Sequence, residues 1–157
     1  MRVLIVEDDM IIAGHLGPLV ARAGHELVGL AADRGSAIAL LQSVTVDFAF
    51  VDIHLIDGWT GVDVVRAAVA AGAAAAFTTA NFGLVPNDFA GAMGLIEKPY
   101  DEARILDVLA FVQARLEGGT EVPPPQGFAL SPYWKGRPQS ASAPSPAPLL
   151  PRANLQI

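Results

Sequence analysis

Short apolar runs alternate with longer stretches of helical periodicity through the first three quarters of the chain. The apolar runs, which we expect to be β-strands, cover 3–6, 27–31, 48–51, 74–78 and 94–96. The expected helices cover 10–23, 33–43, 60–71 and 101–117. Such alternation predicts an α/β fold in which helices cover both faces of a parallel sheet. Because crossovers are right-handed, we expect a doubly wound, flavodoxin-like sheet of five strands in the order 2-1-3-4-5.

One connection is weaker than the others. Residues 86–93 contain a proline and few periodic apolar residues. A helix there would be short and loose.

Polar side chains stand at the ends of four of these apolar runs. Glu7 and Asp8 follow the first run, Asp52 the third, Thr79 the fourth and Lys98 the fifth. The carboxyl ends of parallel strands share one edge of a sheet, where open α/β sheets place their sites. Clustered carboxylate oxygens bind Mg²⁺ and, through it, phosphoryl groups. One acid at a strand end usually means only a solvated residue or a helix cap, but four strand ends in agreement predict a single acidic pocket.

Composition narrows the classes of partner. The chain has 157 residues, no cysteine and a net charge of −6, and no apolar run approaches the ~20 residues of a membrane span. We therefore expect no disulfide, no signal peptide, no membrane partner and a cytoplasmic location. An acidic chain also lacks the basic face that nucleic-acid binding needs.

The composition changes at Gly118. Residues 1–117 carry seven basic and 15 acidic side chains, whereas 118–157 carry three and one, and nine of the 12 prolines lie in this second segment. Low-complexity Pro/Ser/Ala-rich sequence cannot build a core. We expect a domain over 1–117 and a disordered tail over 118–157.

Four motifs carry a resemblance to a known family. They are Val-Leu-Ile-Val-Glu-Asp-Asp (3–9), Asp-Ile-His-Leu-Ile-Asp-Gly (52–58), Phe-Thr-Thr-Ala (77–80) and Glu-Lys-Pro-Tyr (97–100). In this order and spacing they resemble the receiver domain of two-component response regulators, over residues 1 to about 117. Phe77 to Phe82 resembles a variant of the "FATGUY" signature of a single-domain receiver subfamily.

The resemblance implies a role for each strand-end residue. Asp52 would be the phospho-acceptor, phosphorylated by a sensor histidine kinase or a phosphotransfer protein. Thr79 and Lys98 would bind phosphoryl oxygens. The implied ligands of Mg²⁺ are Glu7, Asp8, Asp52 and the backbone carbonyl of His54. Pro99 after Lys98 indicates a cis bond in a tight turn.

The sequence departs from the family pattern in two places. Receivers usually carry proline four residues after the acceptor and glycine eight after it, but here Ile56 takes the first place and Gly61 comes one residue late. The loop after Asp52 is therefore expected to be one residue longer. Leu95 stands where many receivers have a switching aromatic residue.

The resemblance implies a signalling module rather than an enzyme, with output through contacts to an unknown downstream protein. A phosphate sink or shuttle between kinases is the alternative version. A phosphatase of the haloacid dehalogenase type also uses Asp, Thr, Lys and Mg²⁺, but its nucleophile follows the first strand, in an Asp-x-Asp motif. A non-phosphorylated adaptor would normally have lost Asp52 or Lys98.

Overall fold

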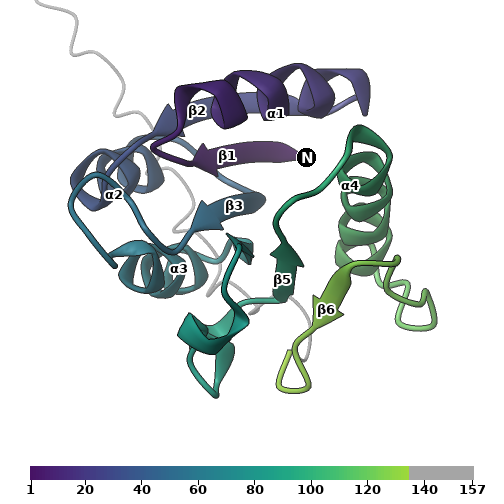
Figure 1. Ribbon diagram of the computed structural model, residues 1–157. Coiled ribbons are helices and arrows are strands. Elements are labelled where there is room, and N and C mark those ends of the chain that lie inside the picture. Colours follow the sequence, from purple (N-terminus) through teal and green to yellow (C-terminus); the bar gives the residue numbers. More distant parts are fainter. Residues whose placement is uncertain (135–157) are drawn as a thin grey trace, which may run out of the picture.

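A six-stranded sheet forms the centre of the molecule in the computed structural model, which describes residues 1–134 (Figure 1). Its order is β2-β1-β3-β4-β5-β6, with β1 to β5 parallel and β6 antiparallel to β5. The strands are β1 Arg2–Val6, β2 Glu26–Ala31, β3 Phe48–Asp52, β4 Ala74–Thr79, β5 Gly94–Glu97 and β6 Phe128–Leu130. The predicted α/β fold and the order of its first five strands are confirmed.

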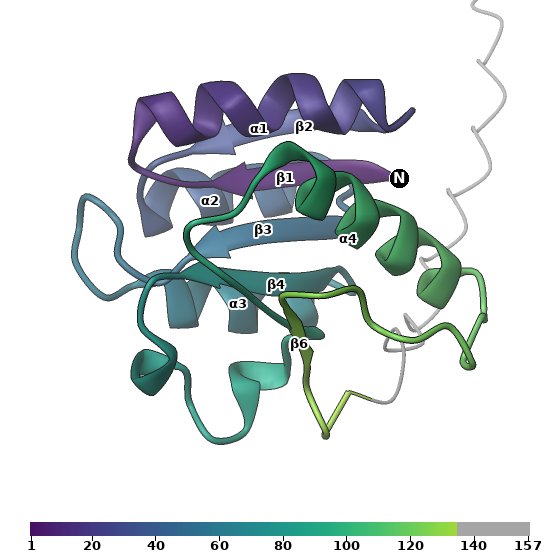
Figure 2. The same ribbon diagram turned by 45° about the vertical axis from the view of Figure 1, so that its right-hand side comes forward.

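Four helices cover the two faces of this sheet. Helices α1 and α4 lie on one face, and α2 and α3 lie on the other (Figures 1 and 2). The helices are α1 Met10–Arg22, α2 Arg34–Ser43, α3 Gly61–Ala70 and α4 Glu102–Leu116. Successive side chains of β1 point to opposite faces of the sheet. Val3 and Ile5 pack in the core cluster beneath α1 and α4. Leu4 and Val6 pack in the second core cluster, beneath α2 and α3. Burial on both faces explains why the strands are continuous apolar runs.

Aspartates begin three of the helices. The side chains of Asp9, Asp33 and Asp101 accept hydrogen bonds from backbone N–H groups in the first turns of α1, α2 and α4. These caps satisfy donors that a helix start leaves without partners. Helix α1 continues through Pro18 to Arg22.

The crossover from β4 to β5 contains no α-helix. Two short 3-10 turns, Phe82–Leu84 and Phe89–Gly91, replace the loose helix expected over 86–93. The backbone is left-handed at Phe89 (φ 53°) and Ala90 (φ 51°). Side chains rarely adopt this conformation, so this turn is strained and depends on its packing, which includes the buried Ala90.

The sixth strand corrects the expectation of five strands and of a structureless chain after residue 117. Phe128 is 5% exposed, and its ring centroid lies 5.4 Å from that of Phe111 on α4. In the register of the two strands Phe128 pairs with Ile96. The Phe128 ring and the carbonyl oxygen of Ala129 lie against the buried Gly94, whose bare Cα leaves room for both. A three-residue strand has no periodicity to detect, and only this tertiary contact reveals it.

Further contacts continue this attachment as far as the described residues reach. The Ser131 N–H donates to the carbonyl oxygen of Met93 at 2.8 Å. The Arg115 guanidinium lies 5.7 Å from the Phe111 ring centroid and 5.4 Å from that of Trp134, within cation–π range. The domain boundary at 117 stays a prediction, and 135–157 of the expected tail lie outside the described residues. Within residues 1–134, no helix has the length and apolar character of a membrane span.

The β6 contact leads to a prediction about two glycines. Gly94→Ala should lower the free energy of unfolding by about 1–3 kcal/mol, because the new methyl group overlaps Ala129 and Phe128. Gly14→Ala is the matched control: its methyl group meets open space on helix α1, so we expect a gain of about 0.5–1 kcal/mol. Urea unfolding of both variants measures this. A neutral Gly94→Ala would show that β6 is not packed on β5 in solution.

Candidate functional site

The carboxyl edge of the sheet brings the expected site residues together. Glu7 and Asp8 follow β1, Asp52 ends β3, and Thr79 ends β4. Carboxylate oxygens of Glu7, Asp8 and Asp52 all lie within 4.8 Å of one another. Three carboxylates at this spacing repel one another and together attract a cation.

Lys98 supplies a cation at this cluster. Its Nζ donates to Glu7 Oε2 at 2.8 Å and to Asp52 Oδ2 at 2.7 Å. Its backbone N–H donates to the carbonyl oxygen of Thr79 at 2.8 Å, which joins the ends of β4 and β5. The Lys98–Pro99 peptide bond is cis, as the sequence indicated.

Burial and ion pairing have opposite effects on the pKa values of Glu7 and Lys98. Glu7 is 3% exposed, and burial raises the pKa of its carboxyl above the ordinary value, while the hydrogen bond and charge of Lys98 offset this only in part. Burial lowers the pKa of Lys98, but its hydrogen bonds to Asp52 and Glu7 and their charges outweigh that effect and raise it. Lys98 therefore stays charged at neutral pH, and Glu7 depends on it.

The loop after Asp52 is held close to that residue by backbone hydrogen bonds. The His54 N–H donates to Asp52 Oδ1 at 3.3 Å, and the Gly61 N–H donates to the carbonyl oxygen of Ile53 at 3.0 Å. A side chain at Gly61 would overlap the backbone of Asp52. The late glycine is therefore required where α3 begins against the end of β3, and the extra residue is taken up in the loop before it.

Thr79 lies beside the acidic cluster without touching it. Its Oγ1 accepts from the Asn81 N–H at 3.0 Å and donates to the Asn81 carbonyl oxygen at 3.2 Å. Thr79, Asp52 and Lys98 line one cavity of about 280 Å³, together with His54 and other loop residues. A small anion in this cavity would meet a hydroxyl and an ammonium group.

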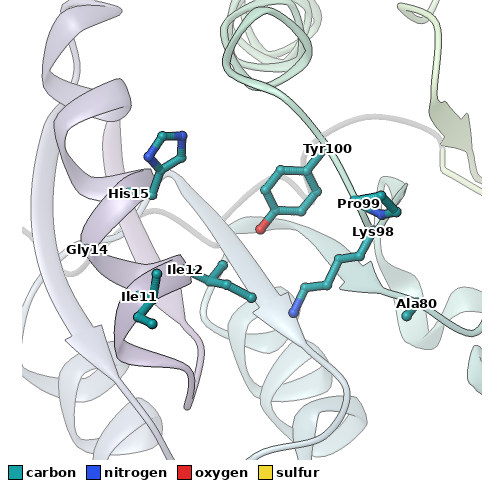
Figure 3. Close-up of a pocket in the computed structure, with 8 residues that line it drawn as sticks. All are labelled: Ile11, Ile12, Gly14, His15, Ala80, Lys98, Pro99 and Tyr100. Carbon is teal, nitrogen blue, oxygen red and sulfur yellow. The ribbon is translucent and has the colours of Figure 1, made fainter.

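A larger groove adjoins the site, and the sequence did not predict it, although Lys98 and Pro99 in its lining were singled out for other roles. Its volume is about 630 Å³. It is lined by the residues that Figure 3 shows, which are Ile11, Ile12, Gly14, His15, Ala80, Lys98, Pro99 and Tyr100. The hydroxyl oxygen of Tyr100 is buried and has no hydrogen-bond partner within residues 1–134. Burial, followed by the charges of Glu7 and Asp52, raises the pKa of this phenol, so it remains a donor at neutral pH.

The pairing of Glu7 with Lys98 leads to a prediction about pH. Lys98→Met leaves the buried Glu7 without its cation, so we expect a loss of about 3 kcal/mol in unfolding free energy at pH 7 without divalent metal. The folded-state pKa of Glu7 then rises further above its unfolded value. A raised folded pKa means stability that returns as pH falls, so the deficit should shrink toward pH 4.5, the ordinary value.

Chemical unfolding between pH 5 and 8, with a chelator present, measures this deficit. The double variant Glu7→Gln/Lys98→Met is the control, and its deficit should be smaller and nearly independent of pH. A constant gap between Lys98→Met and the wild type would contradict the assigned role of Glu7.

Comparisons with known proteins agree with this geometry. The chain is 38% identical over 65 residues to the phyllosphere-induced regulator PhyR of Methylorubrum extorquens, a match that covers 41% of this chain and 24% of PhyR. The solution structure of the Erythrobacter litoralis PhyR receiver domain superposes with a TM-score of 0.62 at 28% identity, covering 71% of this chain and 88% of that domain.

A second similar structure contains bound groups. It is a Burkholderia pseudomallei response regulator with a phosphorylated aspartic acid, a calcium ion and citrate, at 25% identity and a TM-score of 0.60. The match covers 78% of this chain and 75% of that one.

These matches fix the kind of domain but not the whole protein. No family model matches the chain. The match spans about a quarter of the curated relative, PhyR of Methylorubrum extorquens, and the FATGUY subfamily is not confirmed. The strand order and the similar structures nevertheless agree, and the chain has the CheY-like fold that response-regulator receiver domains share.

Proposed function

We propose that this protein accepts a phosphoryl group on Asp52 from a phosphohistidine of a sensor histidine kinase or phosphotransfer protein. The observation that carries the proposal is the position of Lys98, whose ammonium group bridges Asp52 and the buried Glu7. An acceptor carboxylate needs a cation that can follow the charge as it moves onto the phosphoryl group. Lys98 stands at that place.

Asp52 itself suits the role of nucleophile. Its side chain is 14% exposed, so it is accessible from the small cavity that it shares with Thr79. In the transfer, one oxygen of Asp52 attacks phosphorus as the bond to the donor nitrogen breaks. Lys98 and the Thr79 hydroxyl would then hold phosphoryl oxygens, and Ala80 leaves the approach open because its side chain is only a methyl group.

The acidic cluster fits a divalent metal ion, and we propose Mg²⁺. Glu7, Asp8 and Asp52 would hold it together with the backbone carbonyl of His54, an all-oxygen set of the kind this ion prefers. When bound, the ion would neutralise the carboxylates and screen the incoming phosphoryl charge. The calcium ion in the phosphorylated Burkholderia pseudomallei regulator supports a divalent site of this kind.

We propose that the output is a change in protein–protein contact rather than catalysis, and that the protein acts in the cytoplasm with its kinase. PhyR of Methylorubrum extorquens and the similar Burkholderia pseudomallei protein are both named as regulators. The downstream protein partner would read the loops at the carboxyl edge. A haloacid dehalogenase-type phosphatase finds no support, since Asp52 ends β3 and does not follow β1.

The proposal predicts where the phosphoryl group attaches. Asp52→Asn should abolish phosphorylation by phosphoramidate and by a cognate kinase, because the amide is a poor nucleophile. Asp57→Asn is the matched control, an acid of the same loop whose two carboxylate oxygens accept hydrogen bonds from Thr60 and from the Arg34 N–H. The amide oxygen of asparagine can keep one of these two bonds. Intact-protein mass spectrometry measures the phosphoryl group. Full phosphorylation of Asp52→Asn would remove the central claim.

The proposed metal site predicts a stability effect of Mg²⁺. At tenfold excess over its dissociation constant, Mg²⁺ should raise the unfolding free energy by about 1.4 kcal/mol. Asp8→Asn should lose much of this response and be more stable than the wild type without metal, because one repelling charge is gone. Asp9→Asn should keep the response, since Asp9 caps α1 outside the cluster and asparagine caps equally well.

Thermal melts with and without Mg²⁺ compare the three proteins. An unchanged wild-type melting temperature at millimolar Mg²⁺, or an equal response in Asp8→Asn, would contradict the site.

A further inference from the structure

The turn that carries Lys98 is held on both sides. The backbone N–H of Lys98 donates to the carbonyl oxygen of Thr79 at 2.8 Å, which ties the turn to β4. The next residue is Pro99, which has no N–H to donate. Its carbonyl oxygen accepts from Nη1 of Arg104 at 3.3 Å, and Arg104 lies in the first turn of α4. The position of Lys98 therefore depends on α4 as well as on β4.

Arg104 is itself held by two neighbours. Its backbone N–H donates to Oδ1 of the helix cap Asp101 at 2.9 Å, which fixes where the side chain begins. Its guanidinium packs against Gly127, where a Cβ would lie 2.5 Å from Nε and 2.7 Å from Cζ of Arg104. Only glycine leaves room for the guanidinium at this position. Arg104 thus contacts both the turn after Lys98 and the residue that precedes β6.

Strand β6 fixes the place of Gly127. The next residue, Phe128, pairs with Ile96 of β5, two residues before Lys98 (Figure 1). The Phe128 side chain is buried in the core cluster beneath α1 and α4. A continuous set of contacts therefore runs from β6 through Arg104 to the turn that carries Lys98. The segment after residue 117 reaches the site by this route, although none of its residues lines the cavity that contains Asp52.

We propose that Arg104 is a positioning residue for the phosphorylation of Asp52 and that β6 holds Arg104 in place; this rests on the proposed function. Arg104 acts through the Pro99 carbonyl group on the place of the Lys98 ammonium group. That ammonium group meets the charge that moves onto the phosphoryl group during transfer. A small displacement of such a group slows a reaction even where the fold is unchanged.

A simpler explanation is that Arg104 only adds positive charge near an acidic site. A long-range effect of charge would be screened by salt, since the Debye length falls to about 3 Å at 1 M. A positional effect would remain. Arg22 is the matched comparison, because it is an exposed arginine whose ion pair, at 3.0 Å, is with Glu102 of the same first turn of α4.

The experiment measures the rate of phosphorylation by phosphoramidate at fixed Mg²⁺, relative to the wild type, in 0.1 M and 1 M salt. Arg104→Met keeps a long unbranched side chain and loses the donor. It should react roughly threefold to tenfold more slowly at both salt concentrations, the net value of one hydrogen bond. Arg104→Lys keeps a donor and should restore most of the rate. Arg22→Met should react at the wild-type rate in 1 M salt.

Gly127→Ala tests the part that β6 plays. Its methyl group would displace the Arg104 guanidinium from Pro99, so we expect a rate as low as that of Arg104→Met. The two changes act through one contact, so the double variant Arg104→Met/Gly127→Ala should be no slower than either single variant. The left-handed backbone at Gly127 (φ 80°) adds strain to alanine in both backgrounds, and urea unfolding verifies that each variant is folded.

Mg²⁺ binding separates a positioning role from general damage to the site. Lys98 is not among the proposed ligands of the ion, which are Glu7, Asp8, Asp52 and the His54 carbonyl group. Arg104→Met should therefore keep at least the wild-type rise in melting temperature with Mg²⁺ while its phosphorylation is slow. Loss of both properties together would mean that Arg104 supports the whole site and would contradict the inference.

The remaining outcomes are equally distinct. If Arg104→Met reacts at the wild-type rate, or is slow only at low salt, Arg104 does not position Lys98. If the effects of Arg104→Met and Gly127→Ala multiply, β6 does not act through Arg104. Each of these results would leave the phosphorylation of Asp52 intact. If phosphoramidate leaves Asp52 unmodified in the wild type, the proposed function fails and this inference fails with it.

Discussion

The bridge from Lys98 to Asp52 and Glu7 is the interaction on which the site depends. It joins the last strand of the parallel core to β1 and β3, and it compensates a carboxylate that is 3% exposed. A buried ion pair of this kind is weak evidence of stability, because desolvation cancels much of the attraction. The bridge matters for where it places its groups. The doubly wound sheet brings three distant chain segments to one edge, and the ammonium group of Lys98 stabilises negative charge there.

The same cluster carries more negative than positive charge, so binding of a cation or an anion would change its balance. Glu7, Asp8 and Asp52 lie within ligand distance of one another, and Lys98 offsets one of their charges. A metal ion and a phosphoryl group would each change that balance and compete for the lysine. Thr79, now bonded to the backbone of Asn81, would have to leave its present partner to reach a phosphoryl oxygen. The crossover from β4 to β5 consists of 3-10 turns, and its backbone is strained at Phe89 and Ala90. It has fewer regular backbone hydrogen bonds than the helical crossovers.

Much of this could be predicted from sequence because local and global signals agreed. The inner strands β1, β3, β4 and β5 are buried on both faces. All five apolar runs mark their parallel strands to within a residue, and the alternation of strands and helices predicts which strand ends meet. Strand β6 could not be predicted, since Phe128 belongs to the core only because Gly94 and Phe111 lie beside it. The unpaired hydroxyl of Tyr100 could not be predicted for the same reason, because a tyrosine after Lys-Pro indicates neither burial nor the absence of a hydrogen-bond partner.

Strand β6 also limits how a signal can leave the domain. It occupies the edge of β5, and the Ser131 N–H and the Phe128 ring fix it there, so a partner strand cannot add to β5 without displacing it. The helices of one face, α1 and α4, are packed on the core and on each other through buried side chains. The carboxyl edge keeps exposed apolar side chains, Ile56, Trp59 and Phe82, in the segments that follow β3 and β4. Under the proposed function, phosphorylation of Asp52 would add its charge at this same edge, so the input and the readable change would coincide there.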